Sequence, residues 1–459
     1  MSLIRSISGI RGTIGGMPGE GLTPVDTVLY TSAYATWVRN NSGKENPRVV
    51  VGRDARISGE MVEQLVTGTL MAMGINVSLA GLATTPAVEL AVTWLNADGG
   101  IILTASHNPL QWNALKLLNE KGEFLSASDG EEIIRLAEAG RFRYADVLKT
   151  GKTVQVEGLT AYHIRKILEL PLVDTEAIRK ARFRIAIDAV NSVGGLAIPA
   201  LLEALGVETV IPLYCDPTGI FPHNPEPLPE HLKEIADLVV KEKADAGFVV
   251  DPDVDRLAII SEDGSFFNEE YTLVAVADYV LARTPGNTVS NLSSSRALSD
   301  VTRQYGKEYF ASAVGEVNVT ARMKAVGAVI GGEGNGGVIY PDLHYGRDAL
   351  VGIALFLSHL AKSGKSCSEL RKTYPSYVIS KNKIELTATD DIAALIARVK
   401  EFYKDYPVNE EDGLKVDLPE GWFHLRRSNT EPIIRIYAEG KDFAAAEAIA
   451  AEIKKRLKN

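Results

Sequence analysis

The sequence predicts an α/β protein of several domains, three of them similar and the last of a different kind. Three segments share one pattern, in which a helical run ends at a glycine and an apolar segment follows. Other apolar strands alternate with helices of ten or more residues, which is typical of largely parallel sheets joined by helical crossovers. The C-terminal part instead pairs strands with few helices, which is typical of a smaller α+β domain.

The three helix–glycine–strand segments are MAMGINVSLA (71–80), LEALGVETVIPL (202–213) and MKAVGAVIGG (323–332). In each, the glycine can adopt the left-handed conformation that ends a helix. Further strands are expected at PRVVVGRD (47–54), GGIILTA (99–105), FRIAIDA (183–189) and AGFVVD (246–251). Two interpretations stay open at this point: a threefold repeat of one α/β unit, or a junction that recurs in any α/β protein.

The C-terminal elements follow in order. We expect strands at 381–388, 422–426 and 432–440, and helices at 390–406 and 442–459. We place the domains at 1–155, 156–255, 256–372 and 373–459, the first three α/β and the fourth α+β.

Composition limits the function classes. A chain of 459 residues exceeds what one core usually organises. Its net charge of −10 argues against a general nucleic-acid-binding protein, whose phosphate contacts need a basic surface. Only Cys215 and Cys367 are present, which fits a reducing cytoplasm. No apolar stretch is long enough to cross a bilayer, so we expect a cytoplasmic protein that contacts neither membrane nor nucleic acid, as a monomer or homodimer.

Residues 101–116, IILTASHNPLQWNALK, place a serine at the end of a predicted strand. Asn108-Pro109 can simply end the strand, but strand ends in α/β proteins are also where ligands bind. Ser106 lacks the Gly-x-Ser-x-Gly elbow of hydrolases, and its neighbour His107 is not thereby placed as its base.

Three carboxylates alternate in GFVVDPDVDRLAII (247–260), between two apolar strands. Asp251, Asp253 and Asp255 repel one another without a cation, and hard oxygen ligands select Mg²⁺ or Ca²⁺. An EF-hand is excluded because Arg256 stands at the required glycine position. The sequence therefore favours a magnesium site over a solvated acidic turn.

Two polar loops complete the candidate set. HLRRSNTEPIIRIYAEG (424–440) clusters arginine and hydroxyl donors that suit a phosphate. VIGGEGNGGVIY (329–340) sets Glu333 and Asn335 among glycines, which suits sugar hydroxyls that need donors and acceptors. Either loop alone is also explained as a solvated turn or a glycine-rich hairpin.

Six segments, taken in order, resemble the α-D-phosphohexomutase family over essentially the whole chain. They are SGIRG (8–12), VGRDARISG (51–59), TASHNP, DPDVDR, GEGNGG and RRSNTEP. The resemblance implies four domains around a central cleft. It also implies an isomerase that moves a phosphoryl group between O6 and O1 of a hexose phosphate, through a phosphoserine and a bisphosphorylated sugar.

The resemblance implies these residue roles. Ser106 is the phosphorylated residue, and Mg²⁺ binds that group and Asp251, Asp253 and Asp255. Lys116 is the general acid/base, for which we expect a pKa depressed by Arg11 and the metal. Arg11 and His107 steady the phosphoryl group. A hexose 1,6-bisphosphate serves as activator and intermediate, and the substrate-binding residues are Arg256, Glu333, Asn335, Arg426, Ser428, Asn429, Thr430 and Arg435.

The segment GEGNGG (332–337), which the resemblance assigns to sugar binding, departs from the Glu-x-Ser-Gly-His pattern of many bacterial relatives. Asn335 and Gly337 replace its serine and histidine. His344 or Arg347 is a candidate to reach the site instead. The run Thr430-Glu-Pro-Ile-Ile-Arg435 resembles phosphoglucosamine mutases, so we expect glucosamine phosphate, with phosphomannomutase or phosphoglucomutase activity as the alternative. Two rivals remain: a haloacid-dehalogenase-like phosphatase that uses Asp251, and a non-enzymatic sugar-phosphate-binding protein.

Overall fold

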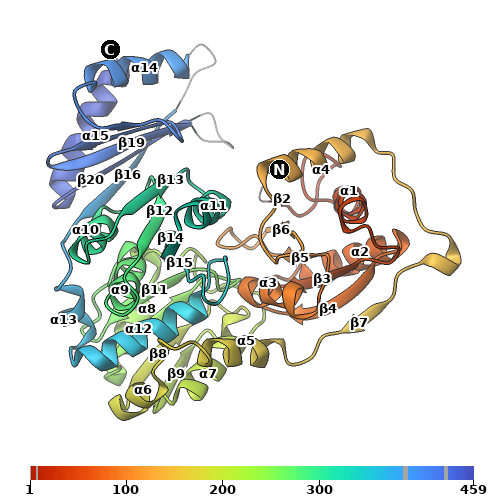
Figure 1. Cartoon of the computed structure of the whole chain (residues 1–459), viewed down its shortest axis with the longest axis horizontal. Helices are drawn as coiled ribbons and strands as arrows, with labels where there is room; N and C mark the ends of the chain where they lie inside the picture. Colours follow the sequence, from red (N-terminus) through yellow and green to blue (C-terminus); the bar gives the residue numbers. More distant parts are fainter. Residues whose placement is uncertain (1, 7–8, 386–390, 428–432, 459) are drawn as a thin grey trace. The chain divides into compact units, whose positions relative to one another are not determined.

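The structure is a computed structural model that describes residues 2–6, 9–385, 391–427 and 433–458 (Figure 1). The chain divides into two units. Met1–Thr272 and Gly336–Ser368 form the first unit, and Leu273–Asn335 and Glu369–Asn459 form the second. The described residues make four sheets, two of them entirely within the first unit.

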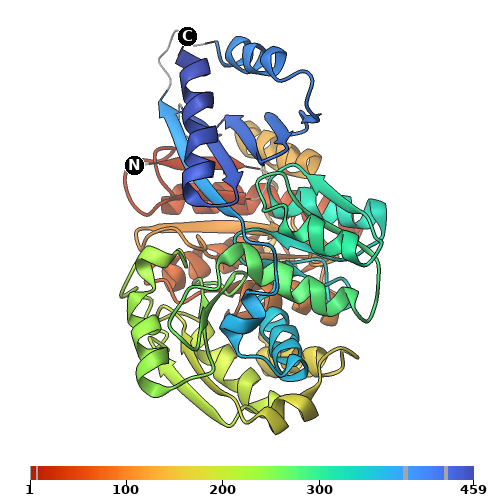
Figure 2. The ribbon, with the colours of Figure 1, turned by 90° about the vertical axis from the view of Figure 1, so that its left-hand side faces the viewer.

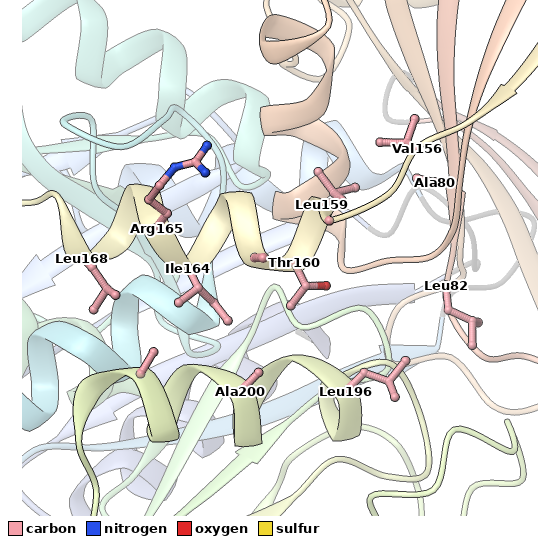
Figure 3. Close-up of a pocket in the computed structure, with 13 residues that line it drawn as sticks. Ala80, Leu82, Val156, Leu159, Thr160, Ile164, Arg165, Leu168, Leu196 and Ala200 are labelled. Atoms are coloured by element: carbon pink, nitrogen blue, oxygen red, sulfur yellow. The ribbon is translucent and has the colours of Figure 1, made fainter.

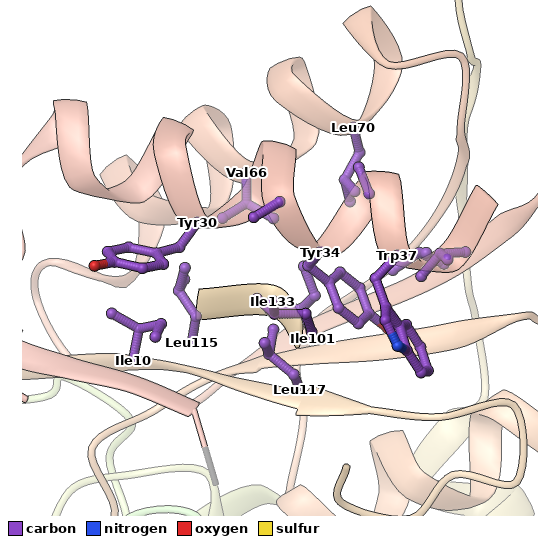
Figure 4. Packing of buried hydrophobic residues seen from close by; sticks show 14 of the residues in the cluster. Ile10, Tyr30, Tyr34, Trp37, Val66, Leu70, Ile101, Leu115, Leu117 and Ile133 are labelled. Carbon is purple, nitrogen blue, oxygen red and sulfur yellow. The ribbon is translucent and has the colours of Figure 1, made fainter. Parts of the chain in front are cut away.

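The first sheet of the first unit has seven strands in the order β1-β2-β6-β5-β3-β4-β7. Alternate residues of its central strands face two separate cores: Val49 and Val51 join one apolar cluster, and Val50 joins the other. In Figure 4, Tyr30, Tyr34 and Trp37 of α1 pack over the first of these faces. The elements are β1 (Leu3–Ser6), β2 (Gly9–Thr13), α1 (Pro24–Ser42), β3 (Arg48–Arg53), α2 (Gly59–Ala72), β4 (Asn76–Leu82), α3 (Thr85–Trp94), β5 (Gly99–Leu103), β6 (Trp112–Leu118), α4 (Ala127–Ala139), the 3₁₀ turn η1 (Val147–Lys149) and β7 (Thr153–Gln155).

The second sheet has four strands in the order β11-β10-β8-β9. A late segment of the chain returns to the first unit with one strand and one long helix, β15 (Gly337–Ile339) and α12 (Ala349–Ser363). The other elements are α5 (Leu159–Leu168), α6 (Thr175–Ala181), β8 (Arg184–Asp188), α7 (Gly194–Leu205), β9 (Thr209–Leu213), η2 (Pro229–His231), α8 (Lys233–Glu242), β10 (Ala246–Val250) and β11 (Leu257–Ser261).

The second unit contains a parallel sheet core, β13-β12-β14, and a five-stranded antiparallel sheet, β16-β20-β19-β18-β17. Helix α15 packs along the antiparallel sheet (Figure 2). Helices α9 (Glu269–Leu281) and α13 (Cys367–Arg371) cross from one unit to the other. The remaining elements are β12 (Asn287–Asn291), α10 (Ala297–Gln304), β13 (Tyr309–Ser312), α11 (Glu316–Val326), β14 (Ala328–Glu333), β16 (Val378–Glu385), α14 (Ile392–Phe402), β17 (Val408–Asn409), β18 (Leu414–Leu418), β19 (Gly421–Arg427), β20 (Ile433–Gly440) and α15 (Phe443–Lys458).

The same strand order recurs three times, which supports the repeat. In the first sheet, β5-β3-β4 are parallel and β6 is antiparallel to β5; in the second, β10-β8-β9 are parallel and β11 is antiparallel to β10. The strands β14-β12-β13 repeat the parallel part. Gly74, Gly206 and Gly327 of the three junctions have φ of +78°, +86° and +59°, as their helix-ending role requires. The predicted fold class is confirmed.

Candidate active site

The serine loop follows β5 directly, and its backbone adopts an unusual conformation. Ser106 is buried and has a φ of +50°, in the left-handed region, which costs a non-glycine residue about 1–2 kcal/mol. Its N–H donates to Thr104 Oγ1 at 2.9 Å, and its Oγ donates to Asp251 Oδ2 at 2.7 Å. The turn thus holds the serine hydroxyl against the aspartate loop.

Arg56 holds this turn, and the sequence reasoning gave it no role. Asp54 Oδ2 accepts a hydrogen bond from Arg56 Nε at 3.0 Å and one from the Thr104 hydroxyl at 2.6 Å. The other guanidinium nitrogens donate four hydrogen bonds of 2.5 to 3.0 Å to the carbonyl oxygens of Ser106, Asn108, Pro109 and Trp112. The one sequence feature that could have pointed to Arg56 is its place in VGRDARISG (51–59), a segment that resembles the family.

Asp251, Asp253 and Asp255 lie in the turn that joins β10 to β11. All three are fully buried, and one oxygen from each lies within 4.8 Å of the others. Asp251 Oδ1 accepts the N–H groups of Asp255 and Arg256, both at 3.2 Å. Val254 has a φ of +64°, which is strained for a β-branched residue. The turn therefore tolerates strain while it gathers three carboxylates at one point.

The charges of this triad favour a bound cation. Burial, and then the charges of Asp255 and Asp253, raise the pKa of Asp251 well above its ordinary value. Burial acts likewise on Asp255, but Arg347, Lys116 and Arg256 outweigh it and hold its pKa below the usual range. Among the described residues, Oδ1 of Asp253 and Oδ1 of Asp255 are buried and accept no hydrogen bond. Such oxygen atoms fit a hard divalent ion.

Lys116 reaches the triad from β6, where it pairs with Ile102 of β5. Its Nζ donates to Asp253 Oδ2 at 2.6 Å and to Asp255 Oδ2 at 3.4 Å. Burial alone lowers the pKa of Lys116, but the two carboxylates outweigh burial and the pKa is raised. The expected depression of this pKa was assigned to Arg11 and a bound metal, so it stays a prediction for the metal-bound site.

His107, Arg11 and Arg256 lie around the serine loop. His107 Nδ1 is 3.3 Å from Ser106 Oγ, and burial followed by Arg256 and Arg11 holds the His107 pKa well below its ordinary value. His107 is therefore a neutral imidazole at physiological pH. Arg11 Nη1 donates to Asn108 Oδ1 at 2.8 Å. Arg256 lies farther out, with its Nε 3.9 Å from Asp255 Oδ1.

Two further residues contact the triad. Arg347, one of the two candidates to replace the family histidine, donates from Nη2 to Asp255 Oδ2 at 2.6 Å. It therefore contacts the turn of Asp251, Asp253 and Asp255, here called the metal loop. His344, the other candidate, contacts carboxylates outside the triad. Thr85, at the start of α3, donates its hydroxyl to Asp253 Oδ2 at 2.5 Å and its N–H to the Asp253 carbonyl at 2.9 Å. No pattern in the sequence indicated that Thr85 contacts the triad.

In the second unit, Glu333 ends strand β14 and its carboxylate is oriented by neighbouring donors. Its Oε1 accepts Asn291 Nδ2 at 2.8 Å and the Gly315 N–H at 3.0 Å. The next peptide, at Gly334, donates to Ser294 Oγ at 3.0 Å. Asn335 is half-buried beside this turn. The glycine-rich segment is thus held by hydrogen bonds on both sides of Glu333.

Arg426 and Arg435 are direct cross-strand partners on β19 and β20, and Lys383 of β16 pairs with Arg435 on the other side. Like charges placed opposite one another destabilise a sheet unless an anion balances them. One counter-charge is present, since Arg426 Nη1 lies 3.4 Å from Asp412 Oδ2. Ser428, Asn429 and Thr430 lie outside the described residues.

An apolar groove of about 710 Å³ lies elsewhere in the first unit, between α5 and α7 and beside β4 (Figure 3). Thr160 and Arg165 are its only polar side chains, so it offers no set of reacting groups. None of the helices in the described part of the chain is long and apolar enough to cross a bilayer.

Comparison with known proteins gives one family over the whole chain. Phosphoglucomutase/phosphomannomutase models match in four consecutive segments: α/β/α domain I at 4–144, domain II at 161–264, domain III at 268–377 and the C-terminal domain at 380–456. A phosphoglucomutase/phosphomannomutase of Thermococcus kodakarensis is 37% identical over 94% of both chains. A phosphoglucosamine/phosphogalactosamine mutase of Sulfurisphaera tokodaii is 32% identical over 99% of both.

A solved structure has the same architecture. The crystal structure of a phosphoglucomutase/phosphomannomutase family protein from Burkholderia thailandensis superposes with a TM-score of 0.85. It is 27% identical, over 99% of this chain and 97% of its own.

Proposed function

Because the chain belongs to the phosphoglucomutase/phosphomannomutase family and is therefore a phosphosugar mutase, we propose that it interconverts glucosamine 6-phosphate and glucosamine 1-phosphate with Ser106 as phosphoryl carrier. The observation that carries the carrier role is the 2.7 Å hydrogen bond from Ser106 Oγ to Asp251, inside a cluster of three buried carboxylates. Membership of this family favours a mutase over the two rival functions, a phosphatase and a non-enzymatic sugar-phosphate-binding protein.

The reaction begins with a phosphoryl group on Ser106. A sugar hydroxyl attacks the phosphorus, the bond to Ser106 Oγ breaks, and a bisphosphorylated sugar forms. The sugar then presents its other phosphate, whose phosphorus is attacked by Ser106 Oγ, and the isomerised monophosphate leaves. A Mg²⁺ ion held by Asp251, Asp253 and Asp255 supplies positive charge to the transferring group. The remaining catalysis is positioning and electrostatics, which this type of transfer requires.

Lys116 is the group we assign to proton transfer. Its amine must lose a proton to accept one from the attacking hydroxyl. The same two carboxylates that raise its pKa, Asp253 and Asp255, are proposed metal ligands. A divalent cation bound to those oxygens would offset their charge at Lys116 and so would counter the rise in the pKa of its amine.

The second unit supplies the proposed substrate contacts. We assign Glu333 and Asn335 to sugar hydroxyls, because a held carboxylate and an amide offer both acceptors and donors. We assign the cation row of Arg426, Arg435 and Lys383, with Ser428, Asn429 and Thr430, to the phosphate that does not react. In the first unit, Arg256, Arg11 and His107 are assigned to the transferring phosphoryl group.

Phosphorus NMR tests the assignment directly. The protein is incubated with Mg²⁺, a trace of the matching hexose 1,6-bisphosphate, and either glucosamine 6-phosphate, mannose 1-phosphate or glucose 1-phosphate. We expect interconversion of all three, fastest for the glucosamine compound. Ser106→Ala is expected to abolish turnover, while Ser128→Ala, on an exposed turn of α4, serves as the matched control. Free phosphate without isomerisation would contradict the mutase assignment.

Glucose or mannose phosphate is the second candidate substrate. It is favoured by the Thermococcus relative, whose name is phosphoglucomutase/phosphomannomutase. Faster turnover of either compound in the same experiment would keep the mechanism and replace the substrate.

A further inference from the structure

Four ionisable side chains that the reaction does not use form a cluster in the first unit; three are buried, and His344 is 12% exposed. They are Glu89 of α3, His163 of α5, His344, and Asp348 at the start of α12, here called the two-histidine network. Asp348 Oδ2 accepts His163 Nε2 at 2.7 Å and His344 Nε2 at 3.2 Å. His344 Nδ1 lies 3.2 Å from Glu89 Oε2. Three segments far apart in sequence therefore meet at two carboxylates.

The network is held tightly. Asp348 also caps α12, since its Oδ1 accepts the N–H groups of Leu350 and Val351 at 2.8 and 3.3 Å. Gly346 leaves no room for a side chain, because a Cβ there would lie 1.9 Å from Glu89 Oε2. Both ring nitrogens of His344 face carboxylates, and its pKa is raised to about 10 against the effect of burial. His344 is therefore a cation that joins Glu89 to Asp348 at neutral pH.

Two of the segments that carry the network also contact the turn of Asp251, Asp253 and Asp255, through residues next to Asp348 and at the start of α3. Arg347, next to Asp348, donates to Asp255 Oδ2 at 2.6 Å, and the Ala349 N–H donates to the Val254 carbonyl at 3.2 Å. Helix α3 carries Glu89, and its first residue, Thr85, binds Asp253. A displacement of Asp348 is thereby passed to Asp255 through one neighbouring residue.

We propose that the two-histidine network, acting through Arg347, positions Asp255 and so makes the metal loop selective for Mg²⁺ over Ca²⁺. The proposal rests on the metal site of the proposed function. Mg²⁺ demands near-ideal octahedral geometry with short bonds, whereas Ca²⁺ accepts longer bonds and variable geometry. Loosening one ligand therefore harms Mg²⁺ binding more than Ca²⁺ binding. Among the described residues the aspartate triad is the only group of three or more His, Cys, Asp and Glu side chains placed to hold an ion, so ion binding to the chain reports on the triad.

Calorimetric titration of the full chain with Mg²⁺ or Ca²⁺ alone, without sugar, measures this selectivity. The ratio of the two dissociation constants cancels any change in site charge, because both ions are divalent. We expect His163→Leu, which removes a donor to Asp348, to lower the preference for Mg²⁺ by up to about tenfold, the low end of the affinity loss when a direct partner of a metal ligand is removed, because His163 acts on Asp255 only through Asp348 and Arg347. His163→Gln, whose amide can still donate, is expected to restore most of it. His231→Gln, in η2, is the matched control.

A double-mutant cycle tests whether the network acts on Asp255 through Arg347. Arg347→Met is expected to lower the ratio by a similar factor, and His163→Leu is expected to add nothing in that background. His344→Gln repeats the test through the second histidine should His163→Leu fail to fold. An unchanged ratio in the network variants, or additive effects with Arg347→Met, would overturn the proposal. Sugar-phosphate interconversion tests the proposed function, whereas the ratio of dissociation constants tests the role of the network. One proposal can therefore be contradicted without the other.

Discussion

At the scale of single residues, Ser106 shows how the chain holds the proposed phosphoryl carrier in a strained conformation. Its left-handed φ of +50° costs free energy that an isolated turn would release. Arg56 opposes that release, because its guanidinium binds four carbonyl oxygens of the turn while Asp54 holds its Nε. The planar fork of arginine is what allows so many fixed directions at once.

Arg56→Lys should therefore harm both stability and turnover, although it keeps the charge. An ammonium group has three donors on one atom and cannot reach four separate carbonyl oxygens, and each buried acceptor left without a donor costs about 1–3 kcal/mol. Urea unfolding and the rate of sugar interconversion measure the two effects. Arg53→Lys, at a side chain that is 20% exposed and 3.4 Å from Glu63, is the control and should change stability little. Equal effects of the two substitutions would contradict the assigned role of Arg56.

The sequence pointed to the proposed phosphoryl carrier and metal ligands, but not to every residue that contacts them. Ser106 and the three aspartates stand in short patterns at strand ends, where chemistry can be recognised locally. Arg56, Thr85 and Arg347 act on partners 50, 168 and 92 residues away. No local pattern encodes those contacts, because only the completed fold brings the segments together. The charges nearest to Lys116, those of Asp253 and Asp255, likewise come from a loop that is distant in sequence.

At the scale of elements, the strands that were predicted are those with unbroken apolar or β-branched runs, such as β3, β5, β8 and β10. Strand β6 was not predicted, because Asn113 and Lys116 interrupt its apolar pattern, although both side chains are buried. Strand β18 was missed as well, because Lys415 and Asp417 interrupt its apolar residues in LKVDL. Polar side chains that serve the site or its support thus obscure the elements that carry them.

Gly336, which ends the glycine-rich segment and precedes β15, tests why this loop needs glycine. It has a φ of +87°, and a Cβ there would lie 2.4 Å from the carbonyl oxygen of Leu257. Gly364, at the end of α12, has a similar φ of +64° but open space around it. Gly364→Ala should cost only the conformational strain, about 1–2 kcal/mol, and Gly336→Ala clearly more. Urea unfolding of both variants measures the difference, and equal losses would mean that the loop relaxes away from Leu257.

At the scale of the whole molecule, the two-histidine network links stability to pH. The pKa of His344 is raised from 6.5 to about 10 in the folded chain. Below pH 6.5 both folded and unfolded chains hold the proton, so the full contribution to stability is present. As the pH rises toward about 10 the unfolded chain releases the proton first and the contribution is lost.

His344→Gln should therefore flatten the pH dependence of unfolding above pH 6.5. The slope removed should approach about 1.4 kcal/mol per pH unit, the value for one proton. Urea unfolding at several pH values measures it, with His231→Gln as the control that keeps the slope. Glu89, Asp348 and His163 face the ring, and all three remain in the variant. An unchanged slope would show that His344 does not carry the proton.

Metal binding should stabilise the folded chain, and Asp251 separates that effect from the intrinsic stability of the loop. The raised pKa of Asp251 favours its neutral form when no cation is bound, and an asparagine resembles that form. Asp251→Asn should therefore unfold in the presence of a chelator at nearly the same temperature as the natural chain. With Mg²⁺ at about 100 times its dissociation constant, the natural chain should gain about 2.7 kcal/mol, and the variant little. Thermal unfolding with chelator and with Mg²⁺ measures both. A large loss in chelator would mean that Asp251 is ionised and paired, whereas a retained Mg²⁺ shift would place the ion on other residues.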